Sequence, residues 1–473
     1  MSNCVVMLKA ELVTLSFVHT IGSILPNDGN NIICRWLLNH DQVWFRSDAM
    51  CPIGAKASRS VSYRRLFDQR ALMLSDPIDV AMISRSLPPY RVYVHRRIVE
   101  GIPQINLHSL VTHALHRWNC PPPDEIRPME FGDEGPDRNK ITLGTLLRDW
   151  QRAGRIIDWI GKSNIRAVIV EGYFDLARLR ILHWCHRTGL PCFLTGDSNI
   201  RGDTAGFPKS WLKRIVVSRV VSWVQGVMPC GTLGEAYFLK YGADPKRVFY
   251  YSREPDCEMI QQLPLDVIAR TQKEFGLHND RRRIVYCGRL VPIKRVDLAI
   301  DAFAAIARDR PQWDLVVIGD GQCEDELKKR VPSDLHDRVI WTGFIADPQQ
   351  IAAIYRASDI LVLPSDFEPW ALVVLEAAAA EMAIISSYAV AAAAEVVREG
   401  VNGGIFDVGD LDGLIQRMQT VTQDDRIDDM KAASAQLLND WRTRADPVEA
   451  LREALKTVGV LGPEDPDLHP VAS

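Results

Sequence analysis

Two glutamates in an apolar stretch are the residues whose type and spacing suggest chemistry most directly. Glu368 follows the turn Pro364-Ser365-Asp366, and Glu376 lies eight positions further on, among valine, leucine and alanine. A carboxylate inside an apolar helix is costly unless it has a partner. A vicinal diol such as that of a ribose would donate two hydrogen bonds to Glu376, and sugar hydroxyls would donate to Glu368. The helix expected from Ala371 and Leu372 would direct free N–H groups towards a phosphate. The alternative is a helix carboxylate that reaches water.

Two cations stand earlier in the chain, just after an apolar run. Residues 284–287 read as a short buried strand, followed by Gly288 and Arg289, and Lys294 precedes an expected helix. A diphosphate would suit this pair of cations, because each charge-assisted contact contributes about 1.5–3 kcal/mol. The alternative is a surface arginine and lysine at a helix start, where the helix dipole does not favour a cation.

Two further turns follow expected strands in the same half of the chain. The run 316–318 leads into Gly319-Asp320-Gly321, but the third glycine of a dinucleotide-binding GxGxxG turn is missing, since Glu324 stands there. Phe344 and Ile345 follow another strand and could offer backbone groups to a base. This pattern predicts a nucleotide site and disfavours an NAD-dependent dehydrogenase.

Short apolar runs separated by helical periods must position these residues. In the first half the expected strands are 80–84, 106–111, 167–170, 191–195, 226–228 and 247–250, and the expected helices are 146–161, 174–187, 210–224 and 232–241. In the second half the expected strands are 284–287, 315–318, 339–341, 360–363 and 383–386. Such alternation is typical of parallel sheets covered on both faces. The sequence therefore predicts an α/β protein with two Rossmann-like parallel-sheet domains facing across a cleft.

The length of 473 residues also requires more than one hydrophobic core. We expect a poorly organised N-terminal extension (1–76), an N-terminal Rossmann-like domain (77–255), a connector with one helix (256–279), a C-terminal Rossmann-like domain (280–445), a closing helix (446–458) and a disordered tail (459–473). The second domain would hold the nucleotide.

Composition narrows the function classes. A net charge of -4 gives no electrostatic reason to bind nucleic acid. The ten cysteines form no CxxC pair, which argues against a zinc or dithiol site and suits a reducing cytoplasm. No apolar run approaches the roughly 18 residues that cross a bilayer. No Asp-x-Asp pattern stands near the candidate residues, so we expect neither a metal nor another cofactor.

Together these pieces resemble the family 4 (group 1) retaining glycosyltransferases of the GT-B fold. The resemblance covers about 283–414 and rests on four pieces in order: Gly288-Arg289-Leu290 with Lys294, Ile318-Gly319-Asp320-Gly321, the Glu368/Glu376 pair, and Glu395 through Gly400 to Asn402-Gly403. It implies that Arg289 and Lys294 hold the donor diphosphate, that Glu368 contacts the donor sugar and that Glu376 contacts the ribose.

The resemblance also implies the activity. It implies metal-independent, retaining transfer of a hexose-type sugar from a nucleoside-diphosphate sugar, with UDP or GDP as the nucleotide, to a saccharide or lipid-linked acceptor in polysaccharide or glycolipid assembly. The acceptor would attack from the face of the leaving phosphate, which takes its proton.

The chain departs from the family at three glycine-rich places. The family has glycines on both sides of an aromatic residue where this chain has Pro369 and Ala371 around Trp370. A Cys-Gly-x-Pro element reads Ala380-Glu381-Met382-Ala383, and a glycine-rich turn reads Ala389-Val390-Ala391-Ala392. Added methyl groups would crowd a backbone–phosphate approach. Two alternatives follow: a nucleotide-sugar-binding relative without catalysis, and a nucleotide-sugar epimerase of the same fold.

The first domain offers acceptor candidates. Two prolines before Tyr90 and Arg91 stiffen the turn that presents them, and Arg91 could hold a hydroxyl or a phosphate. Asp197 occupies the position where family members often carry a histidine near the reacting sugar, so we place it among the catalytic residues. Glu171 ends another strand. The alternatives are packing at a helix start for Arg91 and a turn-forming role for Asp197.

A basic helix in the first domain suggests a membrane contact. Lys209-Ser210-Trp211-Leu212-Lys213-Arg214 opens it, and basic groups beside tryptophan and valine could rest on an anionic bilayer. The alternative, which we favour at this point, is a docked helix with a solvated basic face. We therefore expect a cytoplasmic protein, with peripheral contact at the inner face of the membrane as the second interpretation.

Overall fold

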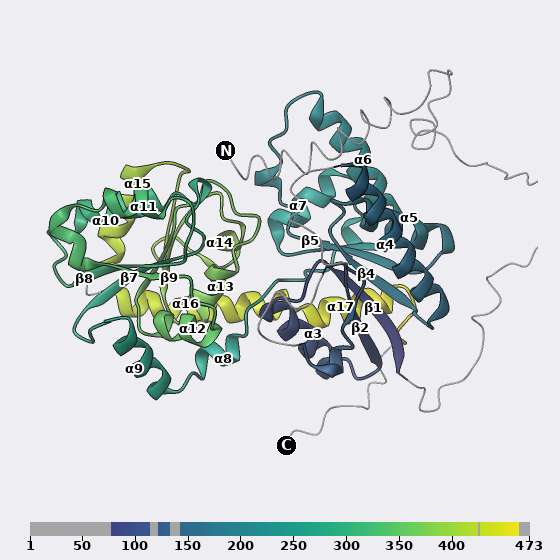
Figure 1. Cartoon of the computed structure of the whole chain (residues 1–473), viewed down its shortest axis with the longest axis horizontal. Helices are drawn as coiled ribbons and strands as arrows, with labels where there is room; N and C mark the ends of the chain where they lie inside the picture. Colours follow the sequence, from purple (N-terminus) through teal and green to yellow (C-terminus); the bar gives the residue numbers. More distant parts are fainter. Residues whose placement is uncertain (1–76, 114–121, 133–141, 424–425, 463–473) are drawn as a thin grey trace, which may run out of the picture.

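A computed structural model of the chain describes residues 77–113, 122–132, 142–423 and 426–462. The predictions for 1–76 and for the tail beyond residue 462 lie outside these residues. The described chain forms two α/β domains that lie side by side, each built on a six-stranded parallel sheet (Figure 1). The predicted fold class is confirmed.

The first sheet has the strand order β3-β2-β1-β4-β5-β6. Its strands are β1 (Ile78–Ser84), β2 (Ile105–Val111), β3 (Met129–Glu130), β4 (Ala167–Glu171), β5 (Cys192–Gly196) and β6 (Gly226–Pro229). Its helices are α3 (Pro89–Gly101), α4 (Leu143–Lys162), α5 (Leu176–Thr188), α6 (Lys209–Trp223) and α7 (Thr232–Lys240). The central strands are buried on both faces because helices cover both.

The second sheet repeats this order, as β12-β11-β10-β7-β8-β9. Its strands are β7 (Arg282–Cys287), β8 (Trp313–Ile318), β9 (Val339–Gly343), β10 (Ile360–Leu363), β11 (Ala383–Ser387) and β12 (Gly403–Phe406). The helices of this half are α8 (Cys257–Gln261), α9 (Leu265–Glu274), α10 (Val296–Ile306), α11 (Glu324–Arg330), α12 (Pro348–Arg356), α13 (Leu372–Ala379), α14 (Ala391–Val396), α15 (Leu411–Val421) and α16 (Ile427–Arg444). No helix of the described residues combines the length and apolar character that crossing a membrane requires.

Three sequence predictions about elements need correction. The predicted strand 247–250 is wrong: Asp244 caps a 3₁₀ turn over Pro245–Arg247, and Val248 forms only a single bridge with Val227. The predicted single helix between the domains is two helices, α8 and α9. The edge strands β3 and β12 were missed because one has two residues and the other begins with two glycines.

In both sheets the strand order reverses once, between β1 and β4 and between β7 and β10. Loops that leave the carboxyl ends of these strands diverge to opposite sides, which opens a crevice where ligands of open α/β sheets bind. The candidate residues of the two domains follow these strands.

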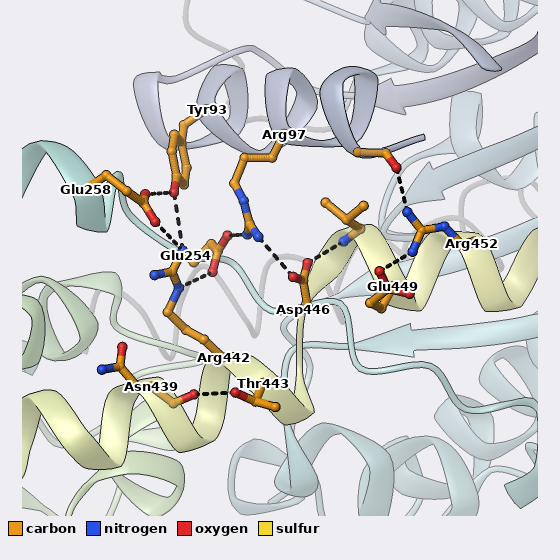
Figure 2. A network of polar contacts seen from close by, with 12 residues as sticks. Tyr93, Arg97, Glu254, Glu258, Asn439, Arg442, Thr443, Asp446, Glu449 and Arg452 are labelled. Carbon is orange, nitrogen blue, oxygen red and sulfur yellow. Dashed lines mark hydrogen bonds and ion pairs between the residues drawn. The ribbon is translucent and has the colours of Figure 1, made fainter. Parts of the chain in front are cut away.

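The chain crosses between the domains twice, and a polar network ties the crossings together (Figure 2). Glu254, on the first crossing, is 1% exposed and accepts hydrogen bonds from Arg97 of α3 and Arg442 of α16. Arg97 also pairs with Asp446, whose side chain caps α17 (Pro447–Thr457) through the Val448 N–H. Helix α17 then packs against α3 and the first sheet. The C-terminal part of the chain thereby returns to the first domain (Figure 1).

Candidate functional site

Glycines bring the turns after β7 and β8 into contact. Gly288, Gly319 and Gly321 have φ values of 155°, 127° and 156°. A Cβ on Gly319 would lie 2.1 Å from the carbonyl oxygen of Gly288, and one on Gly321 would lie 2.3 Å from that of Leu290. Glycine is therefore required for the close approach of the two backbones. The structure explains Gly319 as a packing residue, and its predicted contact with a nucleotide stays a prediction.

Lys294 and Glu368, predicted to bind different parts of one ligand, lie side by side. The ammonium group of Lys294 forms an ion pair with Glu368 Oε1, and the side chains are 15% and 8% exposed. The Ser365 hydroxyl donates to the same carboxylate oxygen at 3.0 Å. A short 3₁₀ turn over Pro292–Lys294 presents the lysine after β7, and the loop after β10 presents the glutamate. The two loops at the reversal of the second sheet thus carry complementary charges.

Glu376 lies in α13, half-buried, and is not turned out to solvent. The Tyr355 hydroxyl donates to Glu376 Oε2 over 3.4 Å. Burial and the charge of Glu376 raise the pKa of the Cys287 thiol, which ends β7 directly before Gly288. Burial raises the pKa of Glu376 to about 7, and the Tyr355 hydrogen bond opposes this only in part. Glu376 is therefore a desolvated carboxylate without a cationic partner among the described residues.

Arg289 and Phe344 are the exposed members of the predicted set. Arg289 follows β7, and its guanidinium has no hydrogen-bond or ion-pair partner in the described part of the chain. Phe344 is 68% exposed just after β9, whereas the neighbouring Ile345 is 7% exposed and packs in the core. Only Phe344 of this pair offers a side-chain surface for a ligand. We name Arg289, Lys294, Glu368 and Glu376 the second-domain site.

Two positions where the related family carries glycine keep a glycine-like backbone. Ala371 has φ 75° and ψ 81° and precedes α13, whose start has no side-chain cap, and Glu381 has φ 59°. An L-residue in this left-handed region costs roughly 1–2 kcal/mol. The backbone adopts a conformation that glycine adopts easily, although neither residue is glycine. The backbone N–H of Leu372 begins the helix as the prediction requires, and its phosphate contact stays a prediction.

The turn 389–392 lies against the Glu368 loop. The Ala391 N–H donates to the Glu368 carbonyl at 3.4 Å, and the Ala392 N–H donates to the Trp370 carbonyl at 2.9 Å. All four residues of the turn are buried. The extra methyl groups are therefore accommodated in the packing between this turn and the loop.

In the first domain, the structure brings together four residues that the sequence predicts for one cleft. Tyr90 and Arg91 open α3, Glu171 ends β4, and Asp197 follows β5. Arg91 pairs with Glu171 Oε1 and donates to the Ser86 carbonyl. Tyr90, Arg91 and Glu171 line a pocket of about 30 Å³, room for one or two water molecules, whereas Asp197 lies outside its lining.

Arg253, which the sequence reasoning missed, connects these residues. Its guanidinium pairs with Glu171 Oε1 at 2.7 Å and with Asp197 Oδ2 at 2.6 Å. Burial alone would raise the pKa of Glu171, but Arg91 and Arg253 hold it at about 2. The sequence feature that could have identified Arg253 is the two adjacent charged residues Arg253 and Glu254, directly before the connector. We name Arg91, Glu171, Asp197 and Arg253 the first-domain cluster.

The two sites are linked across the domains. The Trp370 indole N–H, two residues after Glu368, donates to the carbonyl of Arg253 at 2.8 Å, and Asn199 donates to the Pro369 carbonyl at 3.0 Å. Glu395 of α14 accepts from both the backbone N–H and the hydroxyl of Thr232, at 2.6 Å each, and so caps α7 from the other domain. The loop that carries Glu368 is thus attached to the backbone of the first-domain cluster.

Helix α6 has the exposed basic and aromatic face that its sequence suggested. Phe207, just before the helix, is 86% exposed, and Trp211 is 59% exposed. Arg214 is exposed on the same side, whereas Lys213 pairs with Asp203 at 2.8 Å. Asp203 also accepts from Lys240 and Tyr241, so the loop that presents Phe207 is fixed to α7.

Among the described residues, no group of three or more histidine, cysteine, aspartate and glutamate side chains is arranged to hold a metal ion.

Comparison with known proteins finds a family model that matches the second domain. Residues 267–445 match the family model of glycosyl transferases group 1. A D-inositol 3-phosphate glycosyltransferase of Corynebacterium glutamicum is 27% identical over 259 residues, which are 53% of this chain and 60% of that protein. The chain spans between 15% and 60% of the length of three curated relatives that it matches.

Solved structures share the fold. The Anabaena protein HepE in complex with UDP and glucose has a TM-score of 0.62 at 16% identity, over 81% of this chain and 100% of that one. Sucrose-phosphate synthase from Thermosynechococcus elongatus has a TM-score of 0.64 at 17% identity, over the same shares. The chain thus has the two-domain GT-B fold, and its residues 267–445 match the family model of the group 1 glycosyl transferases.

Proposed function

We propose that this protein is a retaining glycosyltransferase that moves a hexose-type sugar from a nucleoside-diphosphate sugar to a hydroxyl acceptor. The observation that carries the proposal is the second-domain site: an exposed arginine, a lysine paired with a buried glutamate, and a desolvated glutamate surround the reversal of one parallel sheet. A diphosphate requires cations and a helix start. A sugar and a ribose require carboxylates that accept hydrogen bonds from their hydroxyls.

In this proposal Arg289 and Lys294 bind the diphosphate and stabilise the charge that grows on it as the glycosidic bond breaks. Lys294 then exchanges part of its contact with Glu368 for a phosphate oxygen, and the released Glu368 oxygen accepts from a sugar hydroxyl. Glu376 accepts from the ribose diol. The loss of one such charge contact commonly raises the barrier by about 3–4 kcal/mol. These cations would fill the charge-stabilising role of a metal, so we propose a reaction without a metal or other cofactor.

The resemblance motivates retention, and retention without a positioned enzymic nucleophile requires attack from the face of the leaving group. The acceptor hydroxyl attacks the anomeric carbon from the face of the leaving phosphate, the glycosidic bond to that phosphate breaks, and the phosphate takes the acceptor's proton. The HepE complex with UDP and glucose, which has the same fold, supports UDP and a hexose as the first donor to try.

The experiment is a thermal-shift screen with UDP, GDP, ADP and TDP, followed by incubation with the matching nucleotide sugars. A ligand at about 100 times its dissociation constant adds about 2.7 kcal/mol of stability. Arg289→Ala should weaken the shift and the turnover, whereas Arg308→Ala, which changes an arginine with a 90% exposed side chain, should change neither. Equal turnover in Arg289→Ala and the native protein would reject the assignment.

The same measurements separate the alternatives. Nucleotide binding without transfer to any acceptor would favour a non-catalytic relative, for which the left-handed Ala371 is the specific structural reason. Conversion of the nucleotide sugar without an acceptor, seen by NMR, would favour an epimerase.

We also propose peripheral contact of α6 with the inner face of an anionic membrane, where a lipid-linked acceptor would be met. The support is the exposure of Phe207 and Trp211 together with Lys209, Arg214 and Arg219 on a helix that contains no acidic residue. Aromatic side chains with neighbouring cations bind bilayer interfaces.

The cysteines support a location in a reducing cytoplasm. Six of them lie in the described residues, and all six are free thiols.

Sedimentation with vesicles tests this contact. Vesicles of phosphatidylglycerol and phosphatidylcholine should retain the protein at low salt, and pure phosphatidylcholine should not. A Phe207→Ser/Trp211→Ser double variant should lose this binding. Leu265→Ser removes a side chain that is 81% exposed in the second domain and serves as the matched control. Binding that depends on neither aromatic residue nor salt would reject the contact.

A further inference from the structure

The first-domain cluster is a chain of alternating charges that runs from the interior to the surface. Glu171 and Arg91 have side chains that are 12% and 13% exposed, Arg253 follows at 23%, and Asp197 reaches 32%. Each positive group contacts a carboxylate, and Arg253 contacts two. Both arginines share Oε1 of Glu171. The cluster therefore acts as one unit with a defined order from floor to rim.

The charges of this unit cancel. Two arginines face two carboxylates, and Glu171 stays ionised because Arg91, Arg253 and, to a smaller extent, Arg178 hold its pKa at about 2 against the effect of burial. Arg178 has its own carboxylate partner, Asp175, so the charges still cancel. The buried His95 beside Arg91 adds no charge, since burial and Arg91 lower its pKa to about 3. An incoming phosphate would have to take an arginine from a carboxylate that is already desolvated. Leaving a buried carboxylate without its partner is strongly unfavourable.

Hydrogen-bond acceptors remain available in the same place. Glu171 and Asp197 each accept the arginines through one oxygen, Oε1 and Oδ2, and within the described residues no donor is bonded to Glu171 Oε2 or Asp197 Oδ1. A hydroxyl is the natural donor to such an oxygen, and the contact is charge-assisted. The Tyr90 ring, 5.3 Å from the Arg91 guanidinium carbon, lines one pocket with Glu171 and Arg253 and adds an apolar surface.

We propose that the first-domain cluster selects an uncharged, hydroxyl-bearing acceptor and disfavours an acceptor whose binding group is a phosphate. Asp197 and Glu171 are the specificity-determining residues, because their carboxylates neutralise Arg253 and Arg91 and offer the acceptor oxygens. Arg253 is a positioning residue, held by the Trp370 indole at its carbonyl. The inference rests on the proposed transfer function, and it names the class of the second substrate.

The test is a calorimetric titration of the full chain with inorganic phosphate, with the second-domain site filled by a saturating nucleoside diphosphate. The native protein should bind no phosphate at millimolar concentrations. Asp197→Asn frees one side of Arg253 and should bind phosphate at least about tenfold more tightly than the native protein. Glu171→Gln provides a second variant, which frees Arg91 and one side of Arg253. Asp301→Asn, which frees Arg330 in a surface pair of the second domain, should not gain phosphate binding.

Two results would overturn the proposal: phosphate binding by the native protein that Arg253→Gln removes, or no gain in either carboxylate variant. Once transfer is observed, methyl glycosides should exceed their 6-phosphates in kcat/KM, and Asp197→Asn should reduce that preference by about tenfold. If no nucleotide binds, the transfer function fails. The phosphate titration still tests the first-domain cluster, because the residues of that cluster do not belong to the domain of the proposed nucleotide site.

Discussion

In the second-domain site, Arg289 is exposed without a partner and Glu376 is desolvated without a cation, whereas in the first-domain cluster both arginines contact carboxylates. Both places lie where the strand order of a parallel sheet reverses. The fold therefore supplies the location, and the pairing of charges distinguishes the ligands. A site that holds an arginine without a partner fits a charged ligand, and a cluster in which every arginine contacts a carboxylate fits a neutral one.

The largest expected effect is the loss of turnover in Lys294→Ala. The variant removes a cation from the proposed diphosphate contact, so the barrier should rise by about 3–4 kcal/mol, or about 100- to 1,000-fold in kcat/KM. Steady-state kinetics with the donor found in the nucleotide screen measure it. Lys431→Ala is the matched control, because it breaks another half-buried lysine–carboxylate pair of this domain, with Asp359 at 3.0 Å. A comparable loss of turnover in both variants would show a folding defect. The kinetics would then no longer support a diphosphate contact that distinguishes the second-domain site from the first-domain cluster.

The next effect tests whether the first-domain cluster is one unit. Arg253→Gln leaves Glu171 buried with Arg91 as its remaining partner in the cluster and should lower the free energy of unfolding by about 3 kcal/mol. Arg330→Gln, which breaks the more exposed pair with Asp301, should cost less than about 1 kcal/mol. Denaturant unfolding measures both. Nucleotide affinity should stay within about twofold in Arg253→Gln. A large loss of nucleotide affinity would mean that the two sites are not separable.

The second-domain site was largely predictable, because its residues stand close to strand ends within one stretch of sequence. The apolar surroundings of Glu376 and the turns after β7 and β10 are visible in the order of the residues. The ion pair of Lys294 with Glu368 was not, since it depends on how two loops 74 positions apart meet. Gly319 was expected to face a ligand, and only the three-dimensional structure shows it against the Gly288 carbonyl.

The first-domain cluster was predictable only in its parts. Tyr90, Arg91, Glu171 and Asp197 each follow or precede a recognisable strand, so the parallel sheet places them at one edge. Arg253 lies instead on the crossing between the domains, where the wrong strand prediction for 247–250 obscured the local geometry. No periodicity marks such a segment, because its conformation is set by contacts with Glu171, Asp197 and Trp370 from distant parts of the chain.

A smaller effect sharpens the contrast through pH. Burial raises the folded-state pKa of Glu376 to about 7, above its ordinary value, so its contribution to stability is present at low pH and is lost as the pH rises through 7. Glu376→Gln should therefore raise the free energy of unfolding by about 2 kcal/mol near pH 8, with little change near pH 5. Thermal or denaturant unfolding across this range measures it.

The same variant should bind nucleotide more weakly, by about tenfold, because an amide replaces the acceptor of two ribose hydroxyls. Native affinity should increase from about pH 6 to pH 8, since the diol favours the ionised carboxylate, and Glu376→Gln should lose that part of the increase. Gains in both stability and affinity would exclude Glu376 from the nucleotide contact. A gain in stability together with a loss of affinity is the result expected of a carboxylate that binds the ligand from an environment unfavourable to its charge.

The smallest effect concerns the backbone beside Glu368. Ala371→Gly removes the cost of a left-handed alanine, partly offset by the larger freedom of glycine in the unfolded chain, and should gain about 0.5–1 kcal/mol. Glu381→Gly relieves the same strain away from the Glu368 loop and should gain a similar amount. Only Ala371→Gly should also change nucleotide affinity, because only that residue precedes the uncapped start of α13. Equal affinities in the two variants would show that the helix start does not meet the phosphates. The unpaired Arg289, with Lys294 drawn from Glu368, would then have to bind them alone.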